Sequence, residues 1–505
     1  MTTHIVVIGA GDLGVTFALL LDHMRYRSGG TPDWHVTLID RRRSILQGAT
    51  RAAWIDHATG FEYFRPKHTL TGKTCIQGAI TKRLFLPADL HDMPVPIRNR
   101  FFVSTDSHVQ RRVPYEMFAK QASRNVTYYA GFIHRQAKRR DIASDTVYRL
   151  WREHAFGREL ERHEYGGVPK YEVAGGFESA GGVANMAMDY ALKKQALRLA
   201  TSRGTIRELH FNVQTIDLEE RDGGVTVWID EKRIEADLVV STAASGNSLI
   251  AKKAHGVDAS GTYALNFMLY IDLPPTSDAA LREVLASVNF VLQGSDGAMY
   301  ACLVPPTAHD SGVAAVFHPD ARGSHIDRFV TRRGAQPPDW WQEAIATSKF
   351  PSKEERVRNV LKRVYRFNPF LSGYIGGQRT VVGQVFNPSS PSNLEGRDDR
   401  VRVLQNPTLF THAGRVVGMT TPKWTTDELA ALTLINALLP NDGKLYSRPD
   451  GFGPAKLDVV RLASDLGSIN IKFQRELALE YVRHLDLPDR IVPVSHPLFV
   501  ATGDT

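Results

Sequence analysis

The chain has 505 residues, of which 43% are hydrophobic and 23% charged, a composition typical of globular proteins that excludes disordered and fibrous chains. The 62 Lys and Arg residues exceed the 54 Asp and Glu residues, for a formal net charge of +8. This mild excess comes with no nucleic-acid-binding motif, so we expect no nucleic-acid partner and consider an anionic small molecule a suitable ligand. A chain of this length predicts two or three domains.

Cysteine content and hydropathy indicate the compartment in which the protein is expected. The two cysteines, Cys75 and Cys302, are too few for a disulfide framework or a zinc ribbon. No apolar stretch reaches the roughly 18 residues of a membrane span, and no signal-peptide pattern is present. We therefore expect a cytoplasmic protein without a membrane span and without a metal site, and contact with a membrane surface stays open.

The N-terminal segment contains a glycine turn between two apolar runs. Residues 4–8 predict a strand, the Gly-Ala-Gly-Asp-Leu-Gly sequence at residues 9–14 a tight turn, and residues 15–25 a helix. The apolar run at residues 35–39 predicts a second strand, and Asp40 follows it. This order predicts a βαβ unit that binds a dinucleotide, with a purely structural glycine turn as the alternative.

Residues of this motif have expected roles in the cofactor site. Gly9 makes the tight turn, Gly11 lets the backbone approach a pyrophosphate, and Gly14 lets the helix pack closely on the strand. The helix N-terminus presents free N–H groups to the phosphates. Asp40 is expected to accept hydrogen bonds from a ribose hydroxyl, which favours a free 2′-hydroxyl over a 2′-phosphate, and Arg41 beside it is a further candidate.

The middle of the chain continues with helix and strand patterns. Residues 183–202 predict a long helix. Three strand-like runs follow at residues 206–218, 224–229 and 234–242, and an Asp-Gly turn signal separates the first two. The third run ends in small residues, which allow a cofactor to approach closely.

The later part of the chain predicts a different architecture. Alternating strands suit a mixed or antiparallel sheet in a second, inserted domain. The expected strands are residues 262–273, 288–292, 298–304 and 312–318. Helices are expected between residues 326 and 367, followed by one more strand at residues 372–386.

The C-terminal part contains shorter elements. We expect a strand at residues 408–411, a glycine-bearing loop at residues 413–421, and a helix at residues 425–438 that begins with a Thr-Thr-Asp-Glu capping box. Helices at residues 455–485 are expected to form an extension packed on the body of the protein.

This order of parts resembles the D-amino-acid oxidase and glycine oxidase superfamily of flavoproteins over most of the chain, up to about Leu438. The resemblance implies an α/β fold: a Rossmann-like FAD-binding domain with a parallel sheet and helices, an inserted substrate domain with a mixed or antiparallel sheet, and a C-terminal helical extension. The implied boundaries are residues 1–80, 175–260 and 385–440 for the FAD-binding domain, residues 81–174 and 261–384 for the substrate domain, and residues 441–505 for the extension.

The resemblance also implies positions around the cofactor, FAD. Gly9, Gly11, Gly14 and Asp40 would hold its ADP half, Val213 would meet the adenine through its backbone, Thr242 and Ala243 would line its middle, and Gly414, Gly418 and Thr426 would lie by the isoalloxazine ring. The start of the helix at residues 425–438 is expected to stabilise negative charge on the reduced ring. An ordinary capped surface helix is the alternative.

Three residues are candidates for the catalytic site. In relatives an arginine that follows a glycine in this strand clamps the substrate carboxylate, and Arg379 stands in such a context, with a surface ion pair as the alternative. Tyr374 would line the same pocket, unless it is a core residue of the strand. His57 lies in a segment that looks like the early flavin-side loop of relatives, and a surface-loop histidine is the alternative.

The resemblance implies an enzyme that transfers a hydride from the C–H next to an amine nitrogen, in an amino acid or related amine, to flavin N5. Its partners would be a small-molecule substrate with a carboxylate and O2 or another electron acceptor. An FAD-dependent monooxygenase or hydroxylase, a 2-hydroxy-acid dehydrogenase of the same fold, and a flavin-containing scaffold without turnover stay open. The Thr-His-Ala-Gly sequence at residues 411–414 stands where aromatic hydroxylases have a Gly-Asp signature, which counts against that class.

Overall fold

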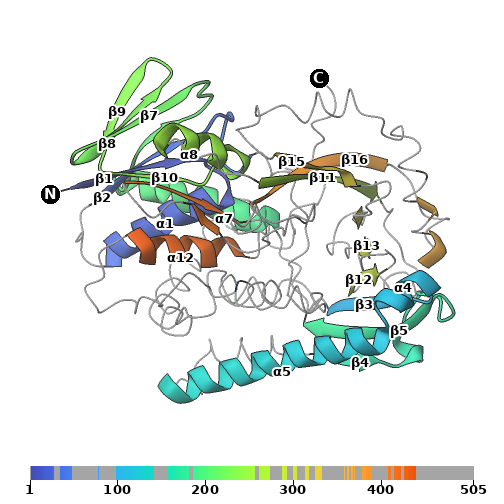
Figure 1. Cartoon of the computed structure of the whole chain (residues 1–505). Coiled ribbons are helices and arrows are strands. Elements are labelled where there is room, and N and C mark those ends of the chain that lie inside the picture. The colour runs from blue at the N-terminus through green and yellow to red at the C-terminus, as the bar shows by residue number, and fades with distance from the viewer. Residues whose placement is uncertain are drawn as a thin grey trace, which may run out of the picture.

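The computed structural model of the chain is shown in Figure 1. It describes residues 2–27, 34–47, 98–140, 157–180, 186–255, 261–272, 287–292, 299–303, 313–317, 325–331, 378–388, 408–410, 415–421 and 426–438, with residues 78, 358, 361–362, 365–367 and 369. The helices predicted at residues 455–485 lie outside these ranges, so the C-terminal extension stays a prediction. Within these ranges, no helix has the length and apolar character needed to cross a membrane.

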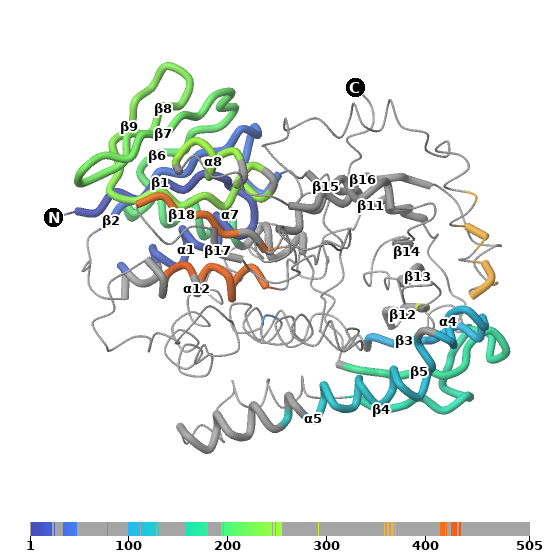
Figure 2. The backbone as a smooth tube through the Cα atoms, viewed as in Figure 1, coloured from blue at the N-terminus to red at the C-terminus, as the bar shows by residue number. Residues whose placement is uncertain are grey.

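Within the described residues, six strands form one sheet in the order β17-β18-β10-β1-β2-β6. Five of them run parallel, and β17 pairs antiparallel with β18. Their bounds are β1 (Thr3–Ile8), β2 (Trp34–Ile39), β6 (Ile206–His210), β10 (Leu238–Ser241), β17 (Thr408–Phe410) and β18 (Val416–Thr420). Figure 2 shows strands from both ends of the described chain side by side in this sheet. The predicted βαβ unit is confirmed, since β1 pairs in parallel with β2 along its whole length.

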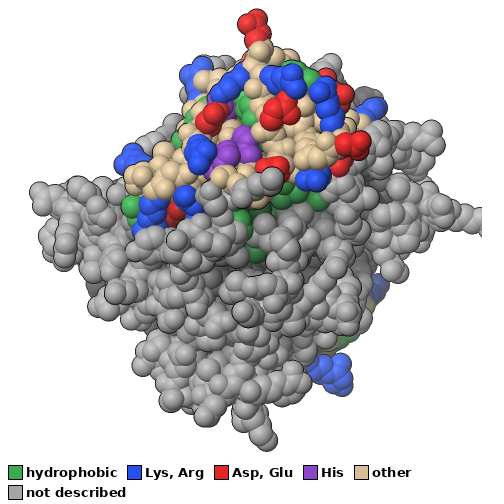
Figure 3. All heavy atoms as spheres, turned by 90° about the vertical axis from the view of Figure 1, so that its left-hand side faces the viewer, with side chains coloured by type: hydrophobic (Ala, Val, Ile, Leu, Met, Phe, Trp, Pro, Cys, Tyr) green, Lys and Arg blue, Asp and Glu red, His purple; other side chains and the backbone are tan. Residues whose placement is uncertain are grey.

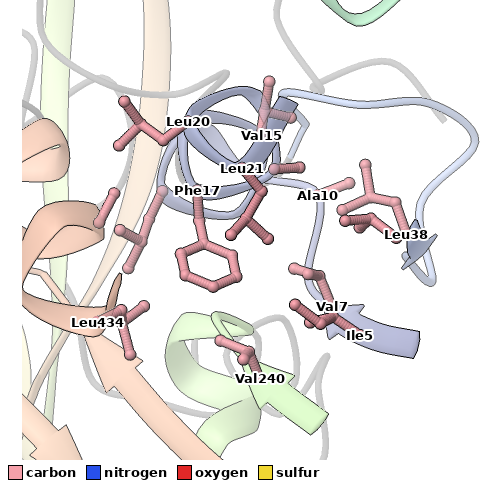
Figure 4. Close-up of a cluster of buried hydrophobic side chains, with 14 of the residues drawn as sticks. Ile5, Val7, Ala10, Val15, Phe17, Leu20, Leu21, Leu38, Val240 and Leu434 are labelled. Atoms are coloured by element: carbon pink, nitrogen blue, oxygen red, sulfur yellow. The ribbon is translucent and has the colours of Figure 1, made fainter. Parts of the chain in front are cut away.

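One face of the parallel sheet is covered by helices. These are α1 (Asp12–Arg27), α7 (Met186–Ser202) and α12 (Asp427–Leu438). Ile5 and Val7 of β1 belong to the same buried cluster as Phe17 of α1 and Leu434 of α12 (Figure 4). Successive residues of a strand point to opposite faces, so this cluster takes alternate residues of β1. The cluster joins the N-terminal helix to the last described helix.

The other face of the sheet is covered by a second buried cluster. Val6 and Ile8 of β1 lie in it with Val225 and Ile250. Its outer layer is a three-stranded antiparallel sheet and the helix α8. The elements are β7 (Ile216–Arg221), β8 (Gly224–Ile229), β9 (Lys232–Ala236) and α8 (Asn247–His255). The parallel sheet is therefore buried on both faces, as its apolar strands predict.

Two predicted strands are each divided in the structure. The run at residues 206–218 forms β6 in the parallel sheet and β7 in the antiparallel sheet, because Asn212 lies between them with φ 61°, a left-handed conformation that asparagine tolerates. The run at residues 234–242 forms β9 and β10. Asp237 separates them, and its carboxylate accepts the backbone N–H of His4 at 2.7 Å.

Two further expectations were wrong in part. The predicted glycine-bearing loop at residues 413–421 contains β18, because Val416 and Val417 are buried and extend the parallel sheet beyond β10. The region expected to turn helical from residue 326 begins with the strand β15 (His325–Thr331), which pairs with β11 (Gly261–Asp272).

A second group of elements contains a mixed sheet and an antiparallel sheet, which confirms the predicted architecture outside the parallel sheet. The mixed sheet has the order β13-β12-β3-β5-β4, and the antiparallel sheet joins β14, β11, β15 and β16. The new bounds are β3 (Arg98–Ser104), β4 (Gly157–Leu160), β5 (Val173–Ala180), β12 (Ser287–Leu292), β13 (Met299–Leu303), β14 (Val313–Phe317) and β16 (Gln378–Pro388). The division into domains by residue number stays a prediction.

The mixed sheet is covered on one face by a long helix that the sequence patterns did not predict. The helix α5 (Tyr115–Arg140) follows the short α4 (Ser107–Arg112). Phe118 of α5 is fully buried and contacts the rings of Phe101 on β3 and Phe177 on β5. Figure 1 shows the N-terminal part of α5 beside β4 and β5, with the rest of the helix extending beyond this sheet.

Candidate functional site

The glycine turn after β1 packs against the end of β10. Gly9 has φ 106°, and a Cβ atom there would lie 2.7 Å from the carbonyl carbon of Thr242. A Cβ atom at Gly14 would overlap the carbonyl oxygen of Gly9. No side chain fits at either position, so these two glycines serve the tight turn and the close packing of α1 that the motif predicts.

The third glycine of the motif is placed differently. Gly11 is partly exposed, whereas the other five residues of the segment 9–14 are buried. It immediately precedes α1, and its carbonyl accepts the N–H of Val15 at 3.0 Å. The first N–H groups of a helix have no partner within the helix and favour an anion. The turn is thus open at the residue where the motif predicts a pyrophosphate.

Asp40, at the end of β2, is tied to this turn. Its Oδ2 atom accepts the N–H of Ala10 at 2.6 Å, and its Oδ1 atom accepts the N–H of Arg42 at 2.7 Å. The residue is partly exposed, as is Arg41. A carboxylate has lone pairs for about four hydrogen bonds, so two backbone bonds leave acceptor capacity for a hydroxyl group.

The backbone of Val213 lies beside that of Asp40. The N–H of Val213 donates to the carbonyl oxygen of Asp40 at 3.3 Å, and the N–H of Asn212 donates to that of Arg42 at 3.0 Å. The side chain of Val213 is buried in the core on the α8 side of the sheet. These bonds place the backbone of Val213 next to the end of β2, and its contact with an adenine stays a prediction.

The segment after β10 is held by Asn247. Its Oδ1 atom accepts the hydroxyl of Ser241 at 2.6 Å and the N–H of Ala243 at 3.0 Å, while its Nδ2 atom donates to the carbonyl of Met419 at 2.8 Å. Asn247 is 1% exposed, so its side chain forms hydrogen bonds with protein groups and not with solvent. The hydroxyl of Thr242 donates to Gly9 O at 2.7 Å. The segment predicted to line the cofactor therefore has a defined position against the glycine turn and β18.

Two non-glycine residues with positive φ flank the glycine turn. Ala244 has φ 49° and follows Ala243, whose Cα atom contacts the position of a Cβ at Gly9. Leu46 has φ 58°, is fully buried, and donates its N–H to Ala10 O at 2.7 Å. Residues in sparsely populated backbone conformations tend to cluster at functional sites. Their convergence here supports the turn as the centre of a site.

The N-terminal turn of α12 meets that of α1 through a lysine. Lys193 of α7 places its Nζ atom 2.6 Å from Asp12 Oδ1 and 3.1 Å from Glu428 Oε1. The sequence motifs do not indicate this arrangement, because the partners are 181 and 235 residues from Lys193 in sequence. The only sequence signal is an aspartate inside the glycine turn.

Two further predicted residues, Thr426 and Gly418, are buried. Thr426 is fully buried and its hydroxyl is hydrogen-bonded to that of Thr421. Gly418 lies on β18 and pairs with Ser241 of β10. Gly414 lies outside the described residues. The proximity of these residues to an isoalloxazine ring stays a prediction.

Of the three predicted catalytic residues, the structure describes only Arg379, and of that residue only the backbone. Arg379 lies on β16, where it pairs with Tyr270 of β11. His57 and Tyr374 lie outside the described residues. The roles of all three as catalytic residues therefore stay predictions.

Charge on the surface over the three-stranded sheet is mixed in sign. Figure 3 shows basic and acidic side chains interspersed on this face, with histidine side chains gathered among them. His4 and His35 stack with ring centroids 4.2 Å apart. Nearby, Glu208 accepts hydrogen bonds from Lys232 and His210, and these lower the pKa of Glu208 to about 2.

Comparison with known proteins defines the fold. No protein-family model matches the sequence, and a comparison with curated proteins finds no match. Among solved structures, iminodiacetate oxidase from Chelativorans sp. BNC1 matches with a TM-score of 0.54 at 14% identity, covering 87% of this chain and 98% of that chain. L-α-glycerophosphate oxidase from Mycoplasma pneumoniae with FAD bound matches with a TM-score of 0.54 at 14% identity, covering 90% and 98%.

An L-amino acid deaminase from Proteus vulgaris is similar to the same degree. It has a TM-score of 0.54 at 13% identity, covering 91% of this chain and 97% of that chain. At such low identities, the similarity establishes the fold. The fold class predicted from the order of motifs is confirmed.

Proposed function

We propose that this chain is an FAD-dependent oxidoreductase that oxidises an amine or an amino acid. One observation carries the proposal: Gly11 is partly exposed between the packed Gly9 and Gly14, and Ala10 holds the Asp40 carboxylate beside this turn. A dinucleotide needs this combination of an open helix N-terminus and a ribose acceptor. The fold shared with iminodiacetate oxidase and L-amino acid deaminase supports the choice of an amine substrate.

The described residues fit the ADP half of FAD. The backbone at Gly11 and the first turn of α1 would bind the pyrophosphate, and Asp40 would accept hydrogen bonds from the ribose. Thr242, which is buried, and the neighbouring Ala243 have small side chains, which take up little space at the end of β10 beside the turn. When bound, FAD supplies the hydride acceptor for oxidation of the substrate C–H.

The residues of the chain would bind and orient the substrate. Arg379 on β16 is proposed to bind a substrate carboxylate, because a guanidinium forms two parallel hydrogen bonds with it and so fixes its rotation. The N-terminal turn of α12 is proposed to lie beside the isoalloxazine ring, where its N–H groups favour negative charge.

A hydroxy substrate is the second candidate. The glycerophosphate oxidase matches this fold with the same TM-score as iminodiacetate oxidase. Oxidation of an alcohol carbon also delivers a hydride, so a shared fold accommodates both substrate classes.

Anaerobic titration of the FAD-loaded protein tests the proposal. Amino acids, secondary amines and 2-hydroxy acids are added in turn, and the visible absorbance of the oxidised flavin is followed. Bleaching by an amine or amino acid supports the proposed class, and release of hydrogen peroxide on re-aeration identifies oxygen as the acceptor. Bleaching by hydroxy acids alone supports the second candidate. Bleaching by NADPH alone, or by no compound, contradicts both.

A further inference from the structure

A single lysine connects three helices of the parallel-sheet region. Lys193, near the middle of α7, contacts Asp12 at the start of α1 and Glu428 at the start of α12. The Lys193 side chain is 10% exposed, and the side chains of Asp12 and Glu428 are 3% and 2% exposed. Burial of charged groups is costly unless they are paired, so the three charges depend on one another.

The two acids lie at helix N-termini. The positive end of each helix would also attract the negative charge of a cofactor phosphate or of a reduced flavin ring. Asp12 lies inside the glycine turn, directly after Gly11, and Glu428 is the second residue of α12. A carboxylate in the first turn of a helix offsets the positive end of the helix dipole. The ammonium group of Lys193 places a positive charge beside the first turns of both α1 and α12. One cation thus serves two helix N-termini.

We propose that Lys193 is a positioning residue that holds the N-terminal turns of α1 and α12 together and whose charge sets both the affinity for FAD and the reduction potential of the bound flavin. The inference rests on the proposed FAD function. Without Lys193, the carboxylates of Asp12 and Glu428 lose their shared counter-ion and repel the pyrophosphate. The additional negative charge also disfavours reduction of the ring.

The charges of the group allow a matched set of variants. The native group carries one positive and two negative charges, a net −1. Lys193→Met gives −2, Glu428→Gln gives 0, and the double variant returns the group to −1. If charge sets the potential, it becomes more negative in Lys193→Met, more positive in Glu428→Gln, and returns toward the native value in the double variant. A role in packing alone does not restore the potential in the double variant.

The control is Lys194, the next residue of α7, which is half-buried and forms no ion pair with either acid in the described part of the chain. Lys194→Met makes the same chemical change one residue away. Lys193→Arg keeps the charge and provides a folded variant if Lys193→Met is unstable. Thermal melting of the FAD-free proteins reports the structural effect separately.

The test is the FAD dissociation constant and the flavin midpoint potential of each variant, measured at one fixed pH. Lys193→Met is expected to weaken FAD binding about tenfold, within the usual range of coupling between sites, while Lys194→Met binds as the native protein does. Native protein that binds FAD, together with a Lys193→Met variant that matches Lys194→Met in both measurements, overturns this inference and leaves the proposed function standing. Native protein that takes up no FAD overturns both.

Discussion

Asp40 accepts a hydrogen bond from the backbone N–H of Ala10 at 2.6 Å, which joins the carboxyl end of β2 to the glycine turn after β1. The second carboxylate oxygen accepts the N–H of Arg42. The bond positions a charged acceptor beside the N-terminus of α1 without using its full capacity. The geometry thus prepares one end of the parallel sheet for a ribose and a pyrophosphate.

Replacing Asp40 by asparagine is expected to weaken FAD binding about tenfold. An amide keeps one of the two backbone hydrogen bonds and loses the charge. Hydrogen bonds to charged groups are worth about 1.5–3 kcal/mol. Equilibrium titration with FAD measures the change. Asp230→Asn is the matched control, since Asp230 also accepts two backbone N–H groups, from Gln214 and Thr215. Equal loss of affinity in the two variants would contradict a role for Asp40 in the site.

Replacing Ala244 by glycine is expected to relieve backbone strain in the folded protein. Its φ of 49° costs an L-residue about 1–2 kcal/mol, whereas glycine adopts this conformation freely. The preceding Ala243 has φ −74°, so the same replacement there relieves no strain; it adds chain entropy to the unfolded state and removes a methyl group that packs against the core. Chemical denaturation of the FAD-free proteins should therefore find Ala244→Gly more stable than Ala243→Gly by about 1–2 kcal/mol. The reverse order would show that Ala244 is not strained.

Asn247→Leu is expected to lower the free energy of unfolding by about 1–3 kcal/mol for the buried carbonyl of Met419 that it leaves unsatisfied, and by less for the part-buried N–H of Ala243. Ser241→Ala removes only the hydroxyl bond to Asn247 and should cost less. Hydrogen exchange by mass spectrometry should show faster exchange in β18 for Asn247→Leu alone. Native-like protection of β18 in that variant would mean that Asn247 does not hold the strand.

Burial lowers the pKa of His4 below its ordinary value of 6.5, against the opposing effects of the Glu235 carbonyl and the carboxylates of Glu208 and Asp237. As the pH falls below about 6.5, the unfolded chain therefore binds a proton that the folded protein resists, and stability is lost. His4→Gln keeps a donor and an acceptor but does not titrate. Its melting temperature should fall less than that of the native protein between about pH 7.5 and about pH 5.5.

The control for this measurement is His163→Gln, because the His163 side chain is 76% exposed. It should follow the native pH profile. A His4→Gln profile that also follows the native one would show that His4 contributes nothing to the acid sensitivity.

The local parts of the site could be predicted from the sequence, because strand, glycine turn and helix follow one another directly. The roles of Gly9 and Gly14 in the turn could be read from their spacing, and the structure shows the close contacts that require them. The contact of Lys193 with Asp12 and Glu428 could not be predicted, since folding alone brings these residues together. Burial of charge depends on such distant partners and leaves no local pattern.

The limits of the strands show the same dependence on distant contacts. Residues 206–218 have a continuous strand-like pattern, but β6 pairs with β2 and β7 pairs with β8. The glycine-bearing residues before α12 form β18 because β10 offers a parallel partner. Strand propensity reflects packing in the sheet more than any intrinsic preference, so the partner decides.

The amount of FAD retained by the native chain and by Gly11→Val shows directly whether the glycine turn after β1 binds the cofactor. Both proteins are incubated with FAD and desalted, and the released flavin is measured against protein. We expect about one FAD per native chain and none in Gly11→Val, because a branched side chain at the partly exposed glycine occupies the space of the pyrophosphate. The two FAD-free proteins should melt at similar temperatures. A native chain that retains no FAD, or a Gly11→Val variant that retains as much as the native chain, would show that the turn does not bind FAD.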